Sequence, residues 1–144
     1  MPLRTTARLR KQVFDRAKGQ CEYCRSQALY TTETFEMEHI MPLARGGETL
    51  FDNLALSCSS CNGRKSDKIE ADDPLTGRRT ALFHPRKEEW THHFCWKDEG
   101  DSVEGLTAVG RASVSFLQMN RLALKNWRQV MRLAGLHPPV EATL

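Results

Sequence analysis

Four of the five cysteines in this chain stand in two C-x-x-C pairs, Cys21 with Cys24 and Cys58 with Cys61. A C-x-x-C turn lets two thiolates bind one metal ion, and two such turns supply the four sulfur ligands that tetrahedral Zn²⁺ prefers. In a chain whose start does not resemble a secretory signal, this spacing favours a metal over disulfides. The sequence therefore predicts a structural zinc site, with reduced buried thiols as the alternative, and leaves Cys95 over.

A four-cysteine site is closed to substrate, so any catalysis must come from other residues. Glu38 and His39 are adjacent between the two pairs, Asn53 follows them, and Asn62 comes directly after Cys61. Phosphodiester hydrolysis needs a base for the attacking water, a cation for the charge that develops on the phosphate, and a group that orients the base. These residue types can fill all three roles.

A neutral imidazole, with an ordinary pKa of about 6.5, makes His39 a candidate base at physiological pH. Glu38 and the side-chain carbonyl of Asn62 are hard oxygen ligands, which favour Mg²⁺ or Mn²⁺ over softer metals. Asn53 can orient the imidazole by accepting a hydrogen bond from its other nitrogen, through its side chain or its backbone carbonyl. Because adjacent side chains on a strand point to opposite faces, the Glu38-His39 pair also predicts a strand end.

Taken together, these residues stand in a known order. The order is Glu38-His39-Ile40, Gly46-Gly47, Asp52-Asn53-Leu54 and then the run from Cys58 to Lys65. Over residues 18–70 the chain resembles the HNH endonuclease family, in its four-cysteine zinc-knuckle branch. The resemblance implies an α+β protein with a ββα-metal (His-Me finger) core, in which two strands and a helix surround one divalent cation.

The resemblance also implies a role for each matched position. His39 would be the general base, Glu38 a ligand of the catalytic cation, and Asn53 the residue that orients the base. Cleavage would leave 5′-phosphate and 3′-hydroxyl ends. Two positions depart from the common pattern, because Asn62 stands where many members have a metal-binding His and Glu38 where many have Asp.

The elements that must position these residues follow from periodicity and breakers. Apolar residues at every fourth position predict a helix from Thr6 to Lys18, ended by Gly19. Residues 29–40 suit a strand or hairpin arm, and 41–53 suit a loop. A helix is expected from Ser59 toward Ile69.

The second half of the chain differs in composition. Aromatic residues gather in 82–96, 97–105 reads as a hairpin or loop, and residues 110–134 have helical spacing with a break near Asn120. We expect a nuclease core with its zinc knuckle at 1–70 and a C-terminal extension at 71–144. The extension, a hairpin and a helix, is expected to pack on the core as one compact unit.

The formal net charge is +3, and it falls to about +1 if four thiolates bind Zn²⁺. The distribution of charge is more informative than the total, because two local basic clusters can attract phosphates. The clusters are Arg4, Arg8, Arg10, Lys11, Arg16 and Lys18 at the start, and Arg111, Arg121, Lys125, Arg128 and Arg132 near the end. The candidate nucleic-acid contacts beside the core are Arg45, Arg64 and Lys65, the last of them one helical turn after Cys61.

No apolar run approaches the roughly 20 residues that span a bilayer, and Met1 to Arg10 is too polar for a signal peptide. A cytoplasmic protein is therefore expected, with double-stranded DNA as its partner, no membrane and no small-molecule cofactor. The oligomeric state is not indicated.

Three other interpretations stay open. The chain could be a non-catalytic zinc module, which would tolerate His39→Ala without loss of function and would need no Mg²⁺. The same site could act on RNA, which parallel cleavage of matched DNA and RNA would reveal. His84, His92, His93 and Cys95 could suggest another metal site, but their spacing is not that of paired ligands and packing among the aromatic residues is the simpler interpretation.

Overall fold

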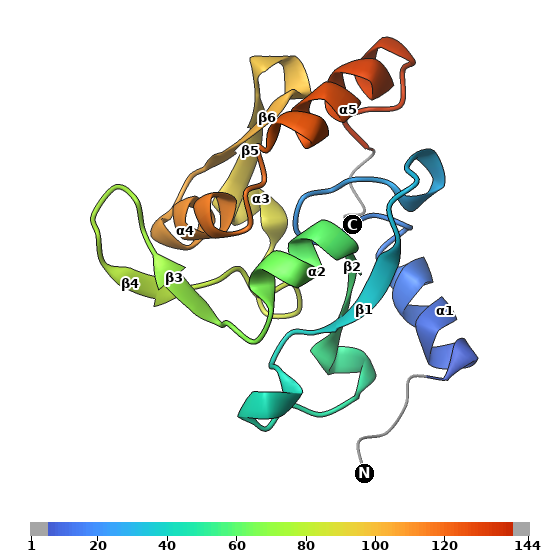
Figure 1. Ribbon diagram of the computed structural model, residues 1–144, viewed down its shortest axis with the longest axis vertical. Helices are drawn as coiled ribbons and strands as arrows, with labels where there is room; N and C mark the ends of the chain where they lie inside the picture. The colour runs from blue at the N-terminus through green and yellow to red at the C-terminus, as the bar shows by residue number, and fades with distance from the viewer. Residues whose placement is uncertain (1–5, 140–144) are drawn as a thin grey trace. The chain divides into compact units, whose positions relative to one another are not determined.

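The computed structural model describes residues 6–139 (Figure 1). Its elements divide into two compact units, one comprising Met1–Ile69 with His84–Lys87 and the other Glu70–Phe83 with Glu88–Leu144. Arg4 of the predicted N-terminal basic cluster lies outside the described residues.

The first unit is built on an antiparallel hairpin followed directly by a helix. Strand β1, Phe35–His39, pairs with β2, Leu54–Cys58, and His39 lies opposite Leu54. Helix α2, Ser59–Lys65, continues from β2 and packs on both strands (Figure 1). This order confirms the predicted α+β class and its ββα core. It also confirms the strand end, because β1 stops at His39.

Helix α1, Ala7–Arg16, begins where the sequence predicts. The Oγ1 atom of Thr6 caps the helix by accepting a hydrogen bond from the backbone N–H of Leu9 at 3.1 Å. Gly19 then takes a φ of +69°, a left-handed conformation that favours glycine. The apolar face of α1 packs on β2, and the core between them contains Val13, Ala17, Leu54 and Leu56.

Arg16 shows that basic residues of the N-terminal cluster also have structural roles. Its guanidinium donates to the carbonyls of Phe51 at 2.8 Å and Leu54 at 2.5 Å, and it lies over the Phe51 ring. Lys11 pairs with Asp15 on the same helix. The other basic residues in the described part of this cluster are exposed and have neither a side-chain hydrogen bond to a carbonyl nor an ion pair. They are Arg8, Arg10 and Lys18.

The loop between the strands, predicted at 41–53, contains two short 3₁₀ turns, η2 at Leu43–Arg45 and η3 at Phe51–Asn53. Gly47 lies so close to the loop's start that a Cβ atom there would collide with the carbonyl of Met41. Its backbone N–H donates to Pro42 at 3.0 Å. The glycine is therefore required for this close approach, which folds the loop back beside β1.

Helix α2 is shorter than predicted. It was expected to run toward Ile69, but it ends at Lys65 because Ser66 takes a φ of +50°. The chain after Ser66 is then drawn toward η2, where the side chain of Arg45 donates to the carbonyl of Asp67 at 2.6 Å. A local break in backbone conformation, which the sequence does not signal, therefore shortens the helix.

The second unit starts with a small hairpin that the sequence did not predict, β3 at Glu70–Asp72 with β4 at Arg79–Ala81. Asp73 organises its turn from a buried position. Its carboxylate accepts hydrogen bonds from the Leu75 backbone and the Thr76 hydroxyl, and pairs with Arg111 at 2.8 and 2.9 Å. This pairing holds the pKa of Asp73 well below its ordinary value.

The predicted aromatic segment and hairpin are confirmed. Helix α3, Trp90–His93, leads into β5, Phe94–Lys97, which pairs with β6, Ser102–Gly105, across the 3₁₀ turn η4, Asp98–Gly100. The aromatic rings of the segment pack on one another, and His93 lies edge-on to Phe83 and Phe94.

The C-terminal helical region is interrupted where the sequence indicates. Helix α4 covers Ala108–Phe116 and α5 covers Leu122–Leu133. Asn120, in the break, pins the chain to β6 by two hydrogen bonds of 2.8 Å with the backbone of Val103.

The structure corrects the prediction for three arginines of the basic cluster near the C-terminus. Arg128 is buried and donates to the carbonyls of Asp101 and Met119. Arg132 pairs with Glu99 and Asp101, both at 3.2 Å, while Arg111 pairs with Asp73. The cluster contains no acidic residue, but acidic residues and backbone carbonyls from other segments pair with these three arginines, so they do not form an open phosphate-binding surface.

Among the helices within residues 6–139, none combines the length and the apolar character that crossing a membrane requires.

Candidate functional site

The four paired cysteines converge in the first unit. Their sulfur atoms lie within 4.8 Å of one another and all four residues are buried. The Sγ atoms of Cys24 and Cys58 are 3.8 Å apart, and a tetrahedron of Zn–S bonds of about 2.3 Å has edges of about 3.8 Å. The cluster therefore fits the predicted structural zinc. Within residues 6–139 it is the only group of three or more His, Cys, Asp or Glu side chains with metal-site spacing.

Local turns bring the sulfurs together. The first pair lies in a tight knuckle in which Arg25 takes a φ of +66° and its N–H donates to the carbonyl of Cys21. The second pair joins β2 to α2, and the Sγ of Cys58 accepts a hydrogen bond from the backbone of Cys61 at 3.4 Å. The Sγ of Cys58 thus caps α2 as well as belonging to the cluster.

The two residues between the first pair of cysteines reach out of the knuckle. Glu22 is tied to β2, because its backbone N–H and its carboxylate both bond to the backbone of Leu56. The same carboxylate pairs with Arg86. Tyr23 points elsewhere, and its hydroxyl donates to Oε2 of Glu38 at 2.7 Å. Burial raises the pKa of Tyr23 well above its ordinary value, and Glu38 adds to the shift, so the phenol is a neutral donor.

Glu38 lies at the end of β1 with only 2% of its side chain exposed. The Nζ atom of Lys65 lies 2.5 Å from its second oxygen, Oε1, and forms a buried ion pair with it. A carboxylate is also a hard oxygen ligand of the kind that divalent cations bind.

Lys65 does not lie where the sequence predicted. It was expected to face a phosphate from the surface of α2, but it is buried, with 2% of its side chain exposed. Its ammonium group donates to the carbonyl of Ile40 at 2.9 Å and neutralises Glu38. A residue one helical turn after Cys61 lies on the same, inner face of α2, so Lys65 is turned away from the surface where the phosphate contact was expected.

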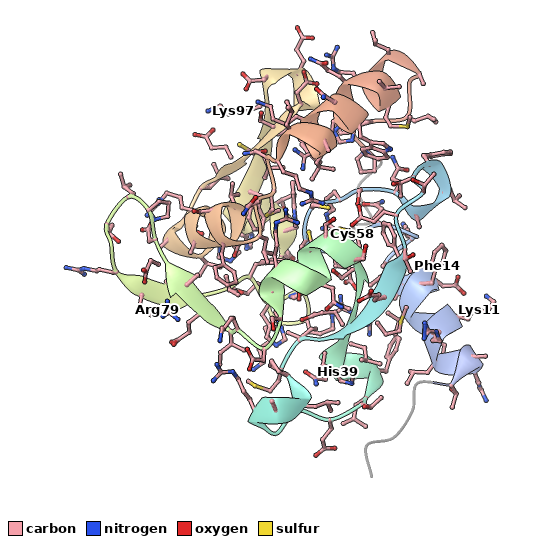
Figure 2. The ribbon with its side chains drawn as sticks, in the orientation of Figure 1. Lys11, Phe14, His39, Cys58, Arg79 and Lys97 are labelled. Carbon is pink, nitrogen blue, oxygen red and sulfur yellow. The ribbon has the colours of Figure 1, made fainter. Side chains whose placement is uncertain are left out.

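His39 is half-buried, and its Nε2 lies 2.9 Å from the hydroxyl of Thr49. Burial lowers the pKa of His39, Glu38 opposes this shift, and Lys65 adds to it. The ring is therefore neutral at pH 7. Figure 2 shows His39 at the loop end of β1, whereas Cys58 lies at the opposite end of the hairpin, where α2 begins.

No hydrogen bond joins Asn53 to the imidazole of His39, so the structure does not show the direct contact that the sequence predicted. Its amide nitrogen donates to the carbonyls of Met41 and Glu48, and its amide oxygen accepts from the backbone of Met41. Its own carbonyl accepts from Ile40. Asn53 thus closes the loop that carries Thr49, and Thr49 is the residue that contacts the ring of His39.

A pocket of about 330 Å³ opens beside these residues. The side chains that line it are Met37, Glu38, His39, Pro42, Leu43, Ala44, Asn62, Ser66 and Asp67. It therefore brings together the predicted base and both predicted oxygen ligands. The amide nitrogen of Asn62 contacts the carboxylate of Glu36, which leaves the amide oxygen for another partner.

Sequence reasoning missed several residues of this site. Ser66 follows Asn62 by four positions, a helical spacing that could have indicated it, and Asp67 comes next. Thr49 and Tyr23 meet the site only through the fold, so no local signal marks them.

The predicted nucleic-acid contacts separate into two groups. Arg45 is exposed on η2, beside the lining residues Leu43 and Ala44. Arg64 is half-buried, and its guanidinium donates to the carbonyl of Ser60 at 3.3 Å. Arg45 can therefore present positive charge beside the pocket, unlike the buried Lys65.

Residues 21–68 match the sequence model of a family described as HNH endonuclease. This segment contains both cysteine pairs and every residue that lines the pocket. Comparison with curated proteins and with solved structures gave no match.

Proposed function

We propose, because residues 21–68 match the model of the HNH endonuclease family, that this protein hydrolyses phosphodiester bonds in DNA with His39 as the general base. The observation that carries the proposal is the pocket, which His39, Glu38 and Asn62 line together. A volume of about 330 Å³ can admit a phosphate group with its attacking water.

The reaction follows from what these residues can hold and move. The neutral ring of His39 takes a proton from a water whose oxygen attacks the phosphorus, and the bond from phosphorus to the 3′ oxygen breaks. The 3′ oxygen takes up a proton from solvent, so the products are a 5′-phosphate and a 3′-hydroxyl. Glu38 and Asn62 would hold a divalent cation, Mg²⁺ or Mn²⁺. When bound, this cation supplies positive charge for the developing phosphorane.

Thr49 would orient the base in place of Asn53. A ring whose Nε2–H donates to Thr49 keeps its lone pair on Nδ1, the nitrogen that can accept a proton. The zinc knuckle takes no part in the chemistry, because four thiolates leave no open coordination position.

Double-stranded DNA is the proposed substrate, bound mainly through its phosphates. Arg45 beside the pocket and the exposed basic residues of the N-terminal region support this. The arginines of the second unit that are paired with acids are excluded from the proposed interface.

The test is cleavage by the zinc-loaded full-length protein in Mg²⁺ or Mn²⁺. Supercoiled plasmid should be converted to nicked or linear forms, and DNA ligase should reseal the nicks because they carry 5′-phosphate and 3′-hydroxyl ends. RNA of matched sequence should remain intact. Cleavage of RNA alone would assign the site to RNA, and no cleavage of either substrate in both metals would refute the nuclease proposal.

Replacing Thr49 by Val should slow DNA cleavage about five- to tenfold, since one hydrogen bond of ~1 kcal/mol to the base is lost. The loss should appear in kcat, with DNA binding unchanged. Thr49→Ser keeps the hydroxyl and should restore most of the rate. Equal rates for Thr49→Val and wild type would show that the Thr49 contact does not orient the base.

A further inference from the structure

Tyr23 links two parts of the first unit that have separate chemistry. It lies between two cysteines of the buried cluster, and its hydroxyl donates to Glu38 at 2.7 Å. Both side chains are almost fully buried, with Tyr23 1% and Glu38 2% exposed. A contact of this kind is not needed to hold zinc, and it does not touch the proposed base.

The carboxylate of Glu38 is held between two partners. Oε2 accepts the hydrogen bond from Tyr23, while Oε1 forms an ion pair with the ammonium of Lys65 at 2.5 Å. Without the hydroxyl, Oε2 would lose its donor, and the Lys65 pair alone would set the orientation of the carboxylate. A carboxylate held at one oxygen only is a less well positioned ligand for a cation.

We propose that Tyr23 is a positioning residue that holds Glu38 for the catalytic cation, so that folding of the cysteine knuckle sets the affinity of the neighbouring pocket for that cation. The inference rests on the proposed function, because it takes Glu38 as a ligand. Partners of metal-binding carboxylates typically change metal affinity or activity about 10- to 100-fold when they are removed. Tyr23 belongs to this class by its geometry.

The chain offers a matched pair of variants, because Tyr23 and Tyr30 are its two tyrosines. Tyr23→Phe removes only the hydroxyl and keeps the buried ring. Tyr30→Phe makes the same change at a residue that is 41% exposed and does not line the pocket. Zinc content and circular dichroism of each full-length variant should equal those of the wild type.

The main measurement is Mn²⁺ binding to the zinc-loaded protein without DNA, followed by electron paramagnetic resonance of the free ion. Tyr23→Phe should bind Mn²⁺ at least about tenfold more weakly than wild type, and Tyr30→Phe should bind it equally well. In cleavage assays, Tyr23→Phe should need a correspondingly higher Mg²⁺ concentration. Its kcat at saturating Mg²⁺ should stay close to that of the wild type.

A second measurement uses the wild-type protein, so it does not depend on whether the Tyr23→Phe variant folds. Wild-type protein labelled with ¹³C at the tyrosine Cζ position gives two signals, which Tyr30→Phe assigns. Added Mg²⁺ should shift the Tyr23 signal and leave the Tyr30 signal in place.

The outcomes separate this inference from the nuclease proposal. Equal Mn²⁺ affinity in Tyr23→Phe and wild type, an unmoved Tyr23 signal, or no Mn²⁺ binding by the wild type would overturn the role of Tyr23, whether or not DNA is cleaved. Weaker Mn²⁺ binding by Tyr23→Phe together with an inactive wild type would support it and refute the nuclease proposal alone.

Discussion

The His39→Ala protein should fold, bind zinc and DNA, and cleave DNA at least about 10³-fold more slowly than the wild type. A positioned general base contributes about 10²- to 10⁴-fold, and Ala removes the group that takes the proton of the attacking water. The side chain is half-buried and its one hydrogen bond is to Thr49, so little of the core depends on it. Plasmid nicking over time in Mg²⁺ and Mn²⁺ measures the loss.

His92→Ala is the matched control. His92 lies on α3 in the second unit with 72% of its side chain exposed, so its removal should leave the nicking rate unchanged. Gel-shift affinity and zinc content should be equal in the wild type and both variants. A His39→Ala rate within tenfold of the wild type would assign the proton transfer to another group. Loss of nicking in both variants would point to a non-specific cause.

The sequence predicted those features that depend on local rules. The start of α1 near Thr6, the Gly19 stop, the C-x-x-C pairs and the strand end at His39 all depend on residue types within a few positions of one another. The break near Asn120 and the hairpin after the aromatic segment were predicted for the same reason. The family resemblance then supplied the order of strand, strand and helix.

The features that were missed depend on partners that are distant in the chain. Lys65 is one helical turn from Cys61, but the spacing alone does not say that the shared face is the inner one, against Glu38. Asn53 was assigned to the imidazole, whereas loop closure uses its whole amide and gives the contact to Thr49. Charge clusters have the same limit, because the arginines near the C-terminus meet acids that lie up to tens of residues away in sequence.

Replacing Cys58 by Ser should abolish zinc binding and unfold the first unit. Structural zinc contributes on the order of 10 kcal/mol to folding, which is comparable to the whole stability of a typical domain, about 5–15 kcal/mol. Cys58 also caps α2 through its sulfur and ends β2, so its loss reaches the strand that pairs with His39. Zinc content, circular dichroism and thermal melting measure the effect, and nicking activity should be lost with the fold.

Cys95→Ser is the control because Cys95 lies outside the cluster, on β5, where its sulfur is 3.8 Å from the carboxylate of Glu104. It should bind one zinc, melt like the wild type and keep its nicking activity. This comparison also avoids a flaw of chelation, since EDTA removes the catalytic cation together with the zinc. A Cys58→Ser protein that retains one tightly bound zinc and the wild-type melting temperature would show that the four sulfurs are not its ligands. Because Tyr23 joins the same knuckle to Glu38, such a result would also remove the physical basis for coupling the knuckle to the pocket.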